Sequence, residues 1–180
     1  MSCDGWVEVI TGPMFSGKTE EFVRRVNEVT LRRQFVRVYR PPTDDRTKEV
    51  VSHSGQRLRR SEYLTETYVE DLDALPRDRV TVAFDEAQFF PSRIVSWAEE
   101  AAQRGARVII AGLDRDYRGM VFGSMKDLIF LADHVEKRAA VCVVCCRDAT
   151  RTQRKDPKGP TVVVGAADLY EPRCKFCHRF

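Results

Sequence analysis

The sequence contains no long hydrophobic run. No stretch offers the roughly 18 uncharged apolar residues that a membrane-spanning helix needs. Its first residues, MSCDGWVEV, also lack the basic and then apolar order of a secretory signal. These absences exclude a membrane-spanning helix and a secreted protein, so we expect a soluble, cytoplasmic protein with no membrane partner.

Charge of one sign is also scarce. Thirty lysines and arginines stand against 27 aspartates and glutamates, which gives a net charge of only +3. A protein that binds a nucleic-acid backbone typically carries a strong basic excess, so we expect no nucleic-acid partner. The 180 residues, with 43% hydrophobic content, are enough for one main core and a small appendage.

Cysteine is nearly absent from the first 141 residues, where only Cys3 occurs. The other five cysteines lie in the last 39 residues and include two Cys-x-x-Cys pairs, Cys142 with Cys145 and Cys174 with Cys177. In a reducing cytosol this spacing favours metal binding over a disulfide framework. Four thiolates in two such pairs suit a closed tetrahedral zinc site, which is structural because no position stays open for water.

Two further residues complicate the ligand set. Cys146 and His178 each adjoin a cysteine of a pair and could ligate in its place. Adjacent residues rarely bind one ion together, so we retain the four cysteines at Cys-x-x-Cys spacing, with 28 residues between the two pairs. The competing interpretation is a set of free, buried cysteines, to which we assign Cys3 and Cys146.

Apolar runs alternate with helical patterns along the rest of the chain, as in a parallel sheet flanked by helices. The sequence predicts an α/β domain over residues 1–140 and a small zinc-binding domain over residues 141–180. Residues 41–60 are predicted to form a long loop with a short strand at Val50 and Val51. We expect strands at residues 6–11, 34–39, 79–84, 107–113 and 134–141, and helices at residues 18–33, 92–103 and 126–132.

The segment GPMFSGKT follows the first predicted strand and precedes the first predicted helix. It fits the pattern G-x-x-x-x-G-K-[ST], in which backbone N–H groups surround phosphate oxygens and glycines leave room for that approach. Lys18 supplies a cation for the outer phosphates and Thr19 a hydroxyl for magnesium. An ordinary glycine turn that caps a helix is the weaker alternative. The predicted phosphate-binding residues are Gly12, Pro13, Met14, Phe15, Ser16, Gly17, Lys18 and Thr19.

Asp85 and Glu86 directly follow the apolar strand predicted at residues 79–84. This position places their carboxylates at the carboxyl edge of the sheet, where open α/β folds bind ligands. An aspartate there typically holds magnesium, and a second acid can take a proton from the attacking group. The alternative is an acidic strand end that faces solvent. Together with the glycine loop, the two acids predict an enzyme that binds and cleaves a nucleoside triphosphate.

Five segments together resemble the thymidine kinase family of cells, bacteria and large DNA viruses, the type with a zinc-bearing lasso. They are GPMFSGKT, DEAQFF, LDRDYRGMVFG, AVCVVC and VVVGAADLYEPRCKFC, in the family's order. The phosphate loop alone is generic, whereas Met14 within it, Gln88 to Phe90 after the acids and the GAADLY stretch are more specific. The resemblance implies a P-loop (RecA-like) α/β fold, mostly parallel, with a small C-terminal zinc-ribbon or lasso domain.

The resemblance also implies an activity, the transfer of the γ-phosphoryl group of ATP to the 5′-hydroxyl of thymidine, and of deoxyuridine as well, in nucleotide salvage for DNA synthesis. It assigns Glu86 as the general base and Asp85 as the residue that steers magnesium. Gln88 joins the phosphate loop in the nucleotide site. Family members assemble as homotetramers and are inhibited by thymidine triphosphate, so both are expected here.

For the nucleoside, the resemblance implies a set of contacting residues. Asp44 and Arg46 match a motif of a mobile loop near the reaction centre. The walls of the thymine pocket and the lasso that closes over the base are assigned to Met14, Phe89, Leu113, Tyr117, Phe122, Thr152, Val163, Gly165 and Tyr170. Without the resemblance, core packing would be the preferred interpretation of these aromatic residues.

Two other functions fit parts of the pattern. The letters DEAQ after an apolar strand also occur in helicases, and zinc ribbons accompany many of them, which favours a nucleic-acid-dependent ATPase. Such machines need a second motor domain, and the weak net charge gives little attraction for a phosphate backbone. A zinc-ribbon binding module with a vestigial nucleotide site is weaker still, because Lys18 and both acids are intact.

Overall fold

The computed structural model describes residues 5–41, 58, 62–64, 80–156 and 169–179. Its main part, which we call the α/β unit, is a six-stranded sheet in the order β3-β2-β4-β5-β1-β6. Every strand pair of this sheet is parallel, which confirms the predicted α/β fold. The strands are β1 (Trp6–Thr11), β2 (Phe35–Tyr39), β3 (Glu62–Leu64), β4 (Val80–Phe84), β5 (Arg107–Gly112) and β6 (His134–Lys137).

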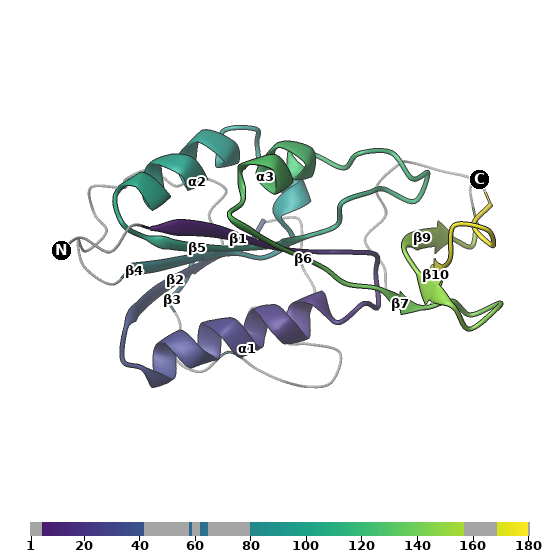
Figure 1. The fold of residues 1–180 in the computed structure, drawn as a ribbon, viewed down its shortest axis with the longest axis horizontal. Coiled ribbons are helices and arrows are strands. Elements are labelled where there is room, and N and C mark those ends of the chain that lie inside the picture. Colours follow the sequence, from purple (N-terminus) through teal and green to yellow (C-terminus); the bar gives the residue numbers. More distant parts are fainter. Residues whose placement is uncertain (1–4, 42–57, 59–61, 65–79, 157–168, 180) are drawn as a thin grey trace.

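Helices cover both faces of the sheet (Figure 1). Helix α1 (Lys18–Leu31) lies on one face, while α2 (Ile94–Gln103) and α3 (Met125–Leu131) lie on the other. Because successive strand residues point to opposite faces, Val9 and Ile10 of β1 belong to different apolar clusters. The alternation seen in the sequence therefore reflects two cores, one on each side of a central sheet.

The last part of the described chain forms a smaller structure at the carboxyl ends of the strands, which we call the C-terminal unit (Figure 1). It contains two antiparallel pairs, β7 with β8 and β9 with β10. A domain boundary at residue 141 stays a prediction. The strands are β7 (Ala140–Val141), β8 (Asp148–Ala149), β9 (Arg151–Arg154) and β10 (Tyr170–Arg173).

The structure corrects the extent of two predicted elements. The strand predicted at residues 134–141 is two strands, because β6 ends at Lys137 and β7 pairs in another sheet. The first helix ends at Leu31, because Arg33 adopts a left-handed backbone conformation with φ of 55°. Such a conformation interrupts a right-handed helix.

The structure also contains elements that the sequence did not predict, and one predicted loop lies largely outside the described residues. Strand β3 and the short 3-10 helix η2 (Ala87–Phe89) were not expected from the sequence. The predicted loop at residues 41–60 lies outside the described residues except for Pro41 and Leu58, and so do its short strand at Val50 and Val51 and the residue Cys3. None of the helices in the described part of the chain combines the length and apolar character needed to cross a membrane.

Candidate active site

Three neighbouring strand ends bring the predicted site residues together. In the sheet, β5 lies between β4 and β1, and all three run in the same direction. The carboxyl ends of parallel strands share one edge of the sheet. The phosphate loop (residues 12–19) follows β1, Asp85 follows β4 and Asp114 lies just after β5. The fold therefore brings these segments to one edge of the sheet, although they are far apart in the sequence.

The phosphate loop closes on itself through its own side chains. The Ser16 hydroxyl donates to the carbonyl oxygen of Pro13 at 2.8 Å, and Lys18 Nζ donates to the same oxygen at 2.7 Å. Gly12, Phe15 and Gly17 have positive φ values of 144°, 65° and 75°. Glycine adopts such values readily, but Phe15 does so at a cost, so the surrounding contacts must hold this residue in place.

Lys18 is electrostatically coupled to the acids that follow β4 and β5. Burial lowers the pKa of its ammonium group below the usual value, while the charges of Glu86, Asp85 and Asp114 act in the opposite direction. Such an effect requires carboxylates close to the ammonium group. The phosphate loop and the acidic pair at residues 85 and 86 thus face one site.

Glu86 has an unusual backbone conformation, and a neighbouring amide binds its side chain. Its backbone is left-handed, with φ of 53°, where it begins η2. The side-chain NH₂ of Gln88 donates to Glu86 Oε2 at 2.6 Å, and Gln88 Oε1 accepts from the backbone N–H of Leu113 at 2.9 Å. Because the Leu113 N–H can only donate, it fixes which end of the buried Gln88 amide faces Glu86. Gln88 therefore ties Glu86 to the end of β5.

Asp114 and Arg40 also line this edge of the sheet but are not among the residues predicted from the sequence. Asp114 pairs with Lys137 at 2.8 Å between Nζ and Oδ2. Arg40, just after β2, has its Nε atom 3.9 Å from Asp85 Oδ2. Asp114 carries the same signal as Asp85, since it follows the apolar strand RVIIAGL almost directly. For Arg40 the sequence offers only its position after an apolar strand.

The residues assigned to the thymine pocket lie in several contacting groups. Phe89 and Phe122 meet edge to face, with ring centroids 5.3 Å apart. Tyr117 is buried, and the guanidinium groups of Arg118 and Arg154 lie 5.2 and 5.4 Å from the centroid of its ring. Both guanidinium groups are close enough to be attracted to the negatively polarised face of this ring.

The phosphate loop contacts the C-terminal unit directly. The backbone N–H of Met14 donates to Thr152 Oγ1 in β9 at 3.0 Å, and Phe15 packs against the apolar cluster around Cys142 and Cys174. Thr152 is buried at this contact. The predicted nucleoside residue Tyr170 is also buried, at the start of β10. The remaining four, Asp44, Arg46, Val163 and Gly165, lie outside the described residues.

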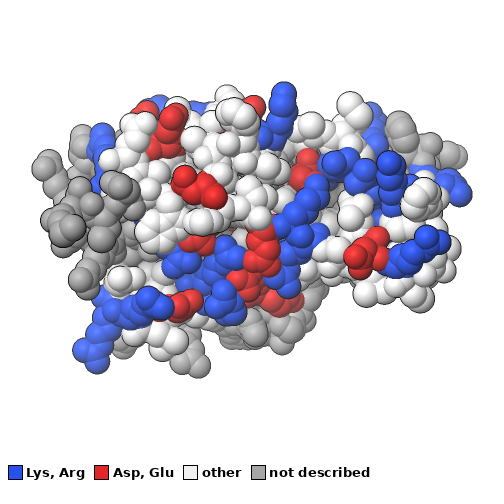
Figure 2. Space-filling view, in the orientation of Figure 1, with Lys and Arg blue, Asp and Glu red and all other residues white. Residues whose placement is uncertain are grey.

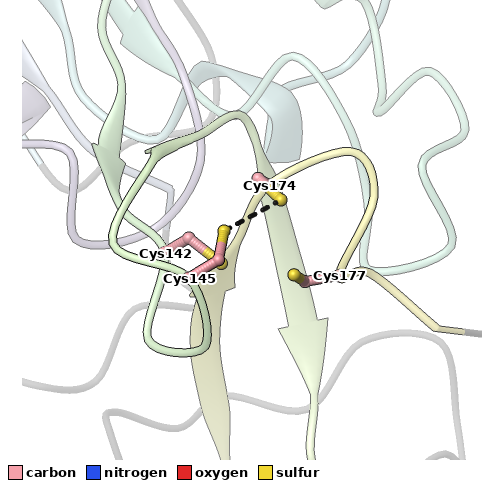
Figure 3. A group of neighbouring side chains, drawn as sticks. All are labelled: Cys142, Cys145, Cys174 and Cys177. Carbon is pink, nitrogen blue, oxygen red and sulfur yellow. Dashed lines mark hydrogen bonds between the residues drawn. The ribbon is translucent and has the colours of Figure 1, made fainter.

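The four cysteines of the two Cys-x-x-Cys pairs point toward one another in the C-terminal unit (Figure 3). Their Sγ atoms all lie within 4.8 Å of one another, and those of Cys145 and Cys174 are 3.5 Å apart. Four sulfurs bound tetrahedrally at about 2.3 Å from a zinc ion lie about 3.8 Å from each other. The cluster of Cys142, Cys145, Cys174 and Cys177 therefore has the ligand type and spacing to hold such an ion.

The thiols of this cluster perturb one another. Burial opposes ionisation of Cys142, but hydrogen bonds from the backbone at Cys174 and Cys145 outweigh it and lower its pKa to about 6. Side-chain hydrogen bonds with Cys174 and Cys145 raise the pKa of Cys177 to about 12. Four thiolates this close cannot all ionise without a cation to neutralise them.

Neither of the two open ligand candidates belongs to this cluster. Cys146 is exposed, and its backbone is left-handed with φ of 59°. His178 Nε2 lies 2.8 Å from the carbonyl oxygen of Tyr117. The imidazole therefore connects the second cysteine pair to the loop that follows β5.

Comparison with known protein families gives one match over nearly the whole chain. Residues 5–178 match the family described as thymidine kinase. The match includes the phosphate loop, the acids after β4 and both cysteine pairs, which the fold has brought to one end of the sheet. The chain belongs to the thymidine kinase family.

Proposed function

We propose that this site transfers the γ-phosphoryl group of ATP to the 5′-hydroxyl of thymidine and of deoxyuridine, in nucleotide salvage for DNA synthesis. Family membership supports the ATP-dependent phosphorylation of thymidine. The observation that carries the assignment to this site is the convergence of Lys18, after β1, with Asp85 and Glu86, after β4, at one edge of the sheet. Phosphoryl transfer requires this combination of cation and carboxylates around the transferred group.

Each group at the site has a distinct part in the proposed reaction. Lys18 and the backbone N–H groups of the phosphate loop bind the phosphates of ATP. Thr19 and Asp85 hold the magnesium ion that accompanies the nucleotide. Glu86 accepts the proton of the attacking hydroxyl, and Gln88 holds that carboxylate through Oε2 at 2.6 Å.

The nucleoside occupies the region between the phosphate loop and the C-terminal unit. Its base packs against Met14, Leu113 and Tyr117, with the aromatic pair Phe89 and Phe122 beside them, since a flat apolar base prefers aromatic and thioether walls. Thr152 and Tyr170 contribute from the C-terminal unit, and the remaining predicted contacts are Asp44, Arg46, Val163 and Gly165. A zinc ion bound by the four cysteines stabilises this unit and takes no part in the chemical step.

The regulatory and cellular properties of the family extend this proposal. They comprise a homotetrameric assembly, inhibition by thymidine triphosphate and a cytoplasmic location. Size-exclusion chromatography with light scattering tests the first. An initial-rate assay over a range of thymidine triphosphate tests the second, and the microscopy of a fluorescent fusion tests the third.

The test of the activity is an assay of the purified protein with ATP, magnesium and a panel of deoxynucleosides. We expect phosphorylation of thymidine and deoxyuridine, and little of purine deoxynucleosides. Glu86→Gln should lower turnover at least roughly hundredfold, the loss typical of a missing general base, with ATP binding retained. ATP hydrolysis that rises with added DNA and ignores nucleosides contradicts the proposal, and wild-type turnover of Glu86→Gln removes Glu86 from its role.

A further inference from the structure

Arg138 contacts the phosphate loop from outside, although it belongs to none of the motifs that carry the family resemblance. It lies between β6 and β7. Its backbone N–H donates to the carbonyl oxygen of Thr11 at 2.7 Å. Its side-chain Nε donates to the carbonyl oxygen of Ser16 at 2.9 Å. One residue thus holds the chain just before the loop and again near the loop's end.

Both glycines of the phosphate-binding pattern lie against Arg138. A Cβ atom placed on Gly12 would lie 2.3 Å from the carbonyl oxygen of Arg138, which is too close for any side chain. A Cβ on Gly17 would lie 3.4 Å from Arg138 Nη2. The requirement for glycine at residue 12 therefore comes in part from Arg138.

The bond to Ser16 also orients a neighbouring N–H group. The peptide between Ser16 and Gly17 is trans, so its C=O and N–H groups point in opposite directions. Because the Ser16 carbonyl faces Arg138, the Gly17 N–H faces away from it. In a loop of this pattern the backbone N–H groups are the donors to phosphate oxygens, so Arg138 determines the direction of one of these donors.

The Arg138 guanidinium group is itself held in place. Its Nη1 atom donates to Glu136 Oε1, and Glu136 Oε2 accepts from Arg25 Nη2 in α1. Arg25 in turn pairs with Glu8 of β1 and with Glu21, each at 2.7 Å. Figure 2 shows acidic and basic side chains intermingled on this face, between α1 and β6. This network connects Arg138 to the helix and to the strand that flank the phosphate loop.

We propose that Arg138 is a positioning residue that holds the phosphate loop in its nucleotide-binding form before ATP arrives, and so sets the affinity for ATP but not for the nucleoside. A preformed loop loses less conformational entropy on binding. The inference rests on the proposed function only in taking the phosphate loop as the ATP site. Arg138 acts through backbone groups and does not touch the reacting atoms.

The test compares Arg138→Met with a matched control, Arg24→Met. Methionine keeps the straight apolar stem and the backbone contacts of Arg138 but removes the guanidinium group. Arg24 is an exposed arginine of α1 that also pairs with two acids, Glu21 and Glu28. It shares Glu21 with Arg25, but no bond described for it is to Arg138 or to a residue of the loop. The measurements are the Kd of magnesium-ADP by titration calorimetry and the separate KM values for ATP and thymidine.

For Arg138→Met we expect the Kd of magnesium-ADP and the KM for ATP to rise about tenfold, the scale of one charge-assisted hydrogen bond. The KM for thymidine should stay within about twofold of the parent value, and Arg24→Met should match the parent throughout. Arg138→Lys, which keeps a cation, should lie between parent and methionine variant. Glu136→Gln weakens only the anchor, so we expect a smaller rise of about threefold.

Unchanged nucleotide affinity in Arg138→Met overturns the proposal. An equal rise of both KM values also overturns it, because that pattern indicates a general loss of structure. If Arg138→Met does not fold, the same readouts on Glu136→Gln and Arg138→Lys decide the matter in the same way. A parent protein that binds magnesium-ADP but phosphorylates no nucleoside contradicts the proposed function alone, because the Kd comparison does not depend on turnover.

Discussion

The two parts of the molecule are stabilised in different ways. The α/β unit has an extensive apolar cluster on each face of its sheet. Among the described residues of the C-terminal unit, the buried apolar cluster consists of Ala140, Cys142, Ala149 and Cys174. Two alanines bury too little surface, at roughly 25 cal/mol per Å², to offset the entropy of ordering the chain around them. One part can fold by hydrophobic burial, whereas the other has four cysteines placed to hold a metal ion, whose binding would add folding stability.

The two parts are nevertheless in contact at the phosphate loop. Phe15, in its left-handed conformation, packs against the cysteine cluster, and the N–H of Met14 donates to Thr152. The phosphate loop therefore has supports of two kinds, Arg138 from the α/β unit and these contacts from the C-terminal unit. The variants described next each remove one ligand or contact, and their measurements show whether the effect extends from one part of the molecule to the other.

Removing the metal should have the largest effect. In Cys142→Ser the cluster loses a thiolate, so we expect the zinc content to fall from one ion per chain to nearly none. Because the free energy of metal binding at such sites stabilises the fold, we also expect thymidine turnover to fall at least roughly hundredfold. Elemental analysis and steady-state assays measure both. The matched control is Cys146→Ser, which alters an exposed cysteine outside the cluster. Less than one zinc ion per chain in the parent protein would refute the metal site.

Lys18→Met should have the next largest effect, confined to the α/β unit. Loss of the ammonium group removes a charged donor to the outer phosphates, so the affinity for magnesium-ATP should fall about ten- to hundredfold. Titration with nucleotide measures this, and the zinc content should not change. The outcome that contradicts the assignment is a nucleotide affinity equal to that of the parent.

Gln88→Leu tests the connection between η2 and β5. Leucine removes the amide that bonds the Leu113 N–H and Glu86 Oε2. Loss of a hydrogen-bond partner at such a site costs about 1–3 kcal/mol of stability. We expect kcat to fall about tenfold with little change in the KM for ATP. Gln88→Glu is the comparison, because it keeps an acceptor for Leu113 but loses the donor to Glu86. Parent-like kcat in both variants shows that Gln88 does not position the carboxylate.

Thr152→Val should have the smallest effect and tests the contact between the two parts. Valine keeps the branched shape but removes the oxygen that accepts from the Met14 N–H. A neutral hydrogen bond contributes about 0.5–1.5 kcal/mol, so we expect a two- to tenfold rise in the KM for thymidine. Thr152→Ser, which retains the hydroxyl, serves as the control. Equal KM values for the serine and valine variants show that the hydrogen bond is not used.

Most of the residues that the structure brings together at the candidate site could be singled out from the sequence, because they lie in short, contiguous patterns. The phosphate loop between strand and helix, the acids after an apolar strand and the Cys-x-x-Cys pairs each need only a few neighbouring letters. The structure places the loop, the acids and the cysteines at one end of the sheet. Strand lengths were less accurate, and the strand predicted at residues 134–141 was wrong because β6 ends at Lys137 and β7 pairs in another sheet, a break that hydrogen bonding decides.

The residues that the sequence analysis did not identify differ in how they could have been found, and some act only through contacts between distant segments. Asp114 carries a local signal that was available, an acid after the apolar strand RVIIAGL. Arg138 carries none, since its role comes from a bond to Ser16 across 122 residues of sequence. The bond between Met14 and Thr152, across 138 residues, belongs to the same class. No periodicity or spacing reports such a pair.

The sequence by itself determined the phosphate loop, the acids that follow β4, the two Cys-x-x-Cys pairs and the α/β character of the fold, because hydrophobic periodicity and local backbone requirements depend on neighbouring residues. Only the tertiary structure decided that β5 separates β1 from β4, that Gln88 holds Glu86 and that Arg138 supports the phosphate loop. These contacts depend on strand order and on the close packing of side chains from separate elements, which are properties of the whole folded chain.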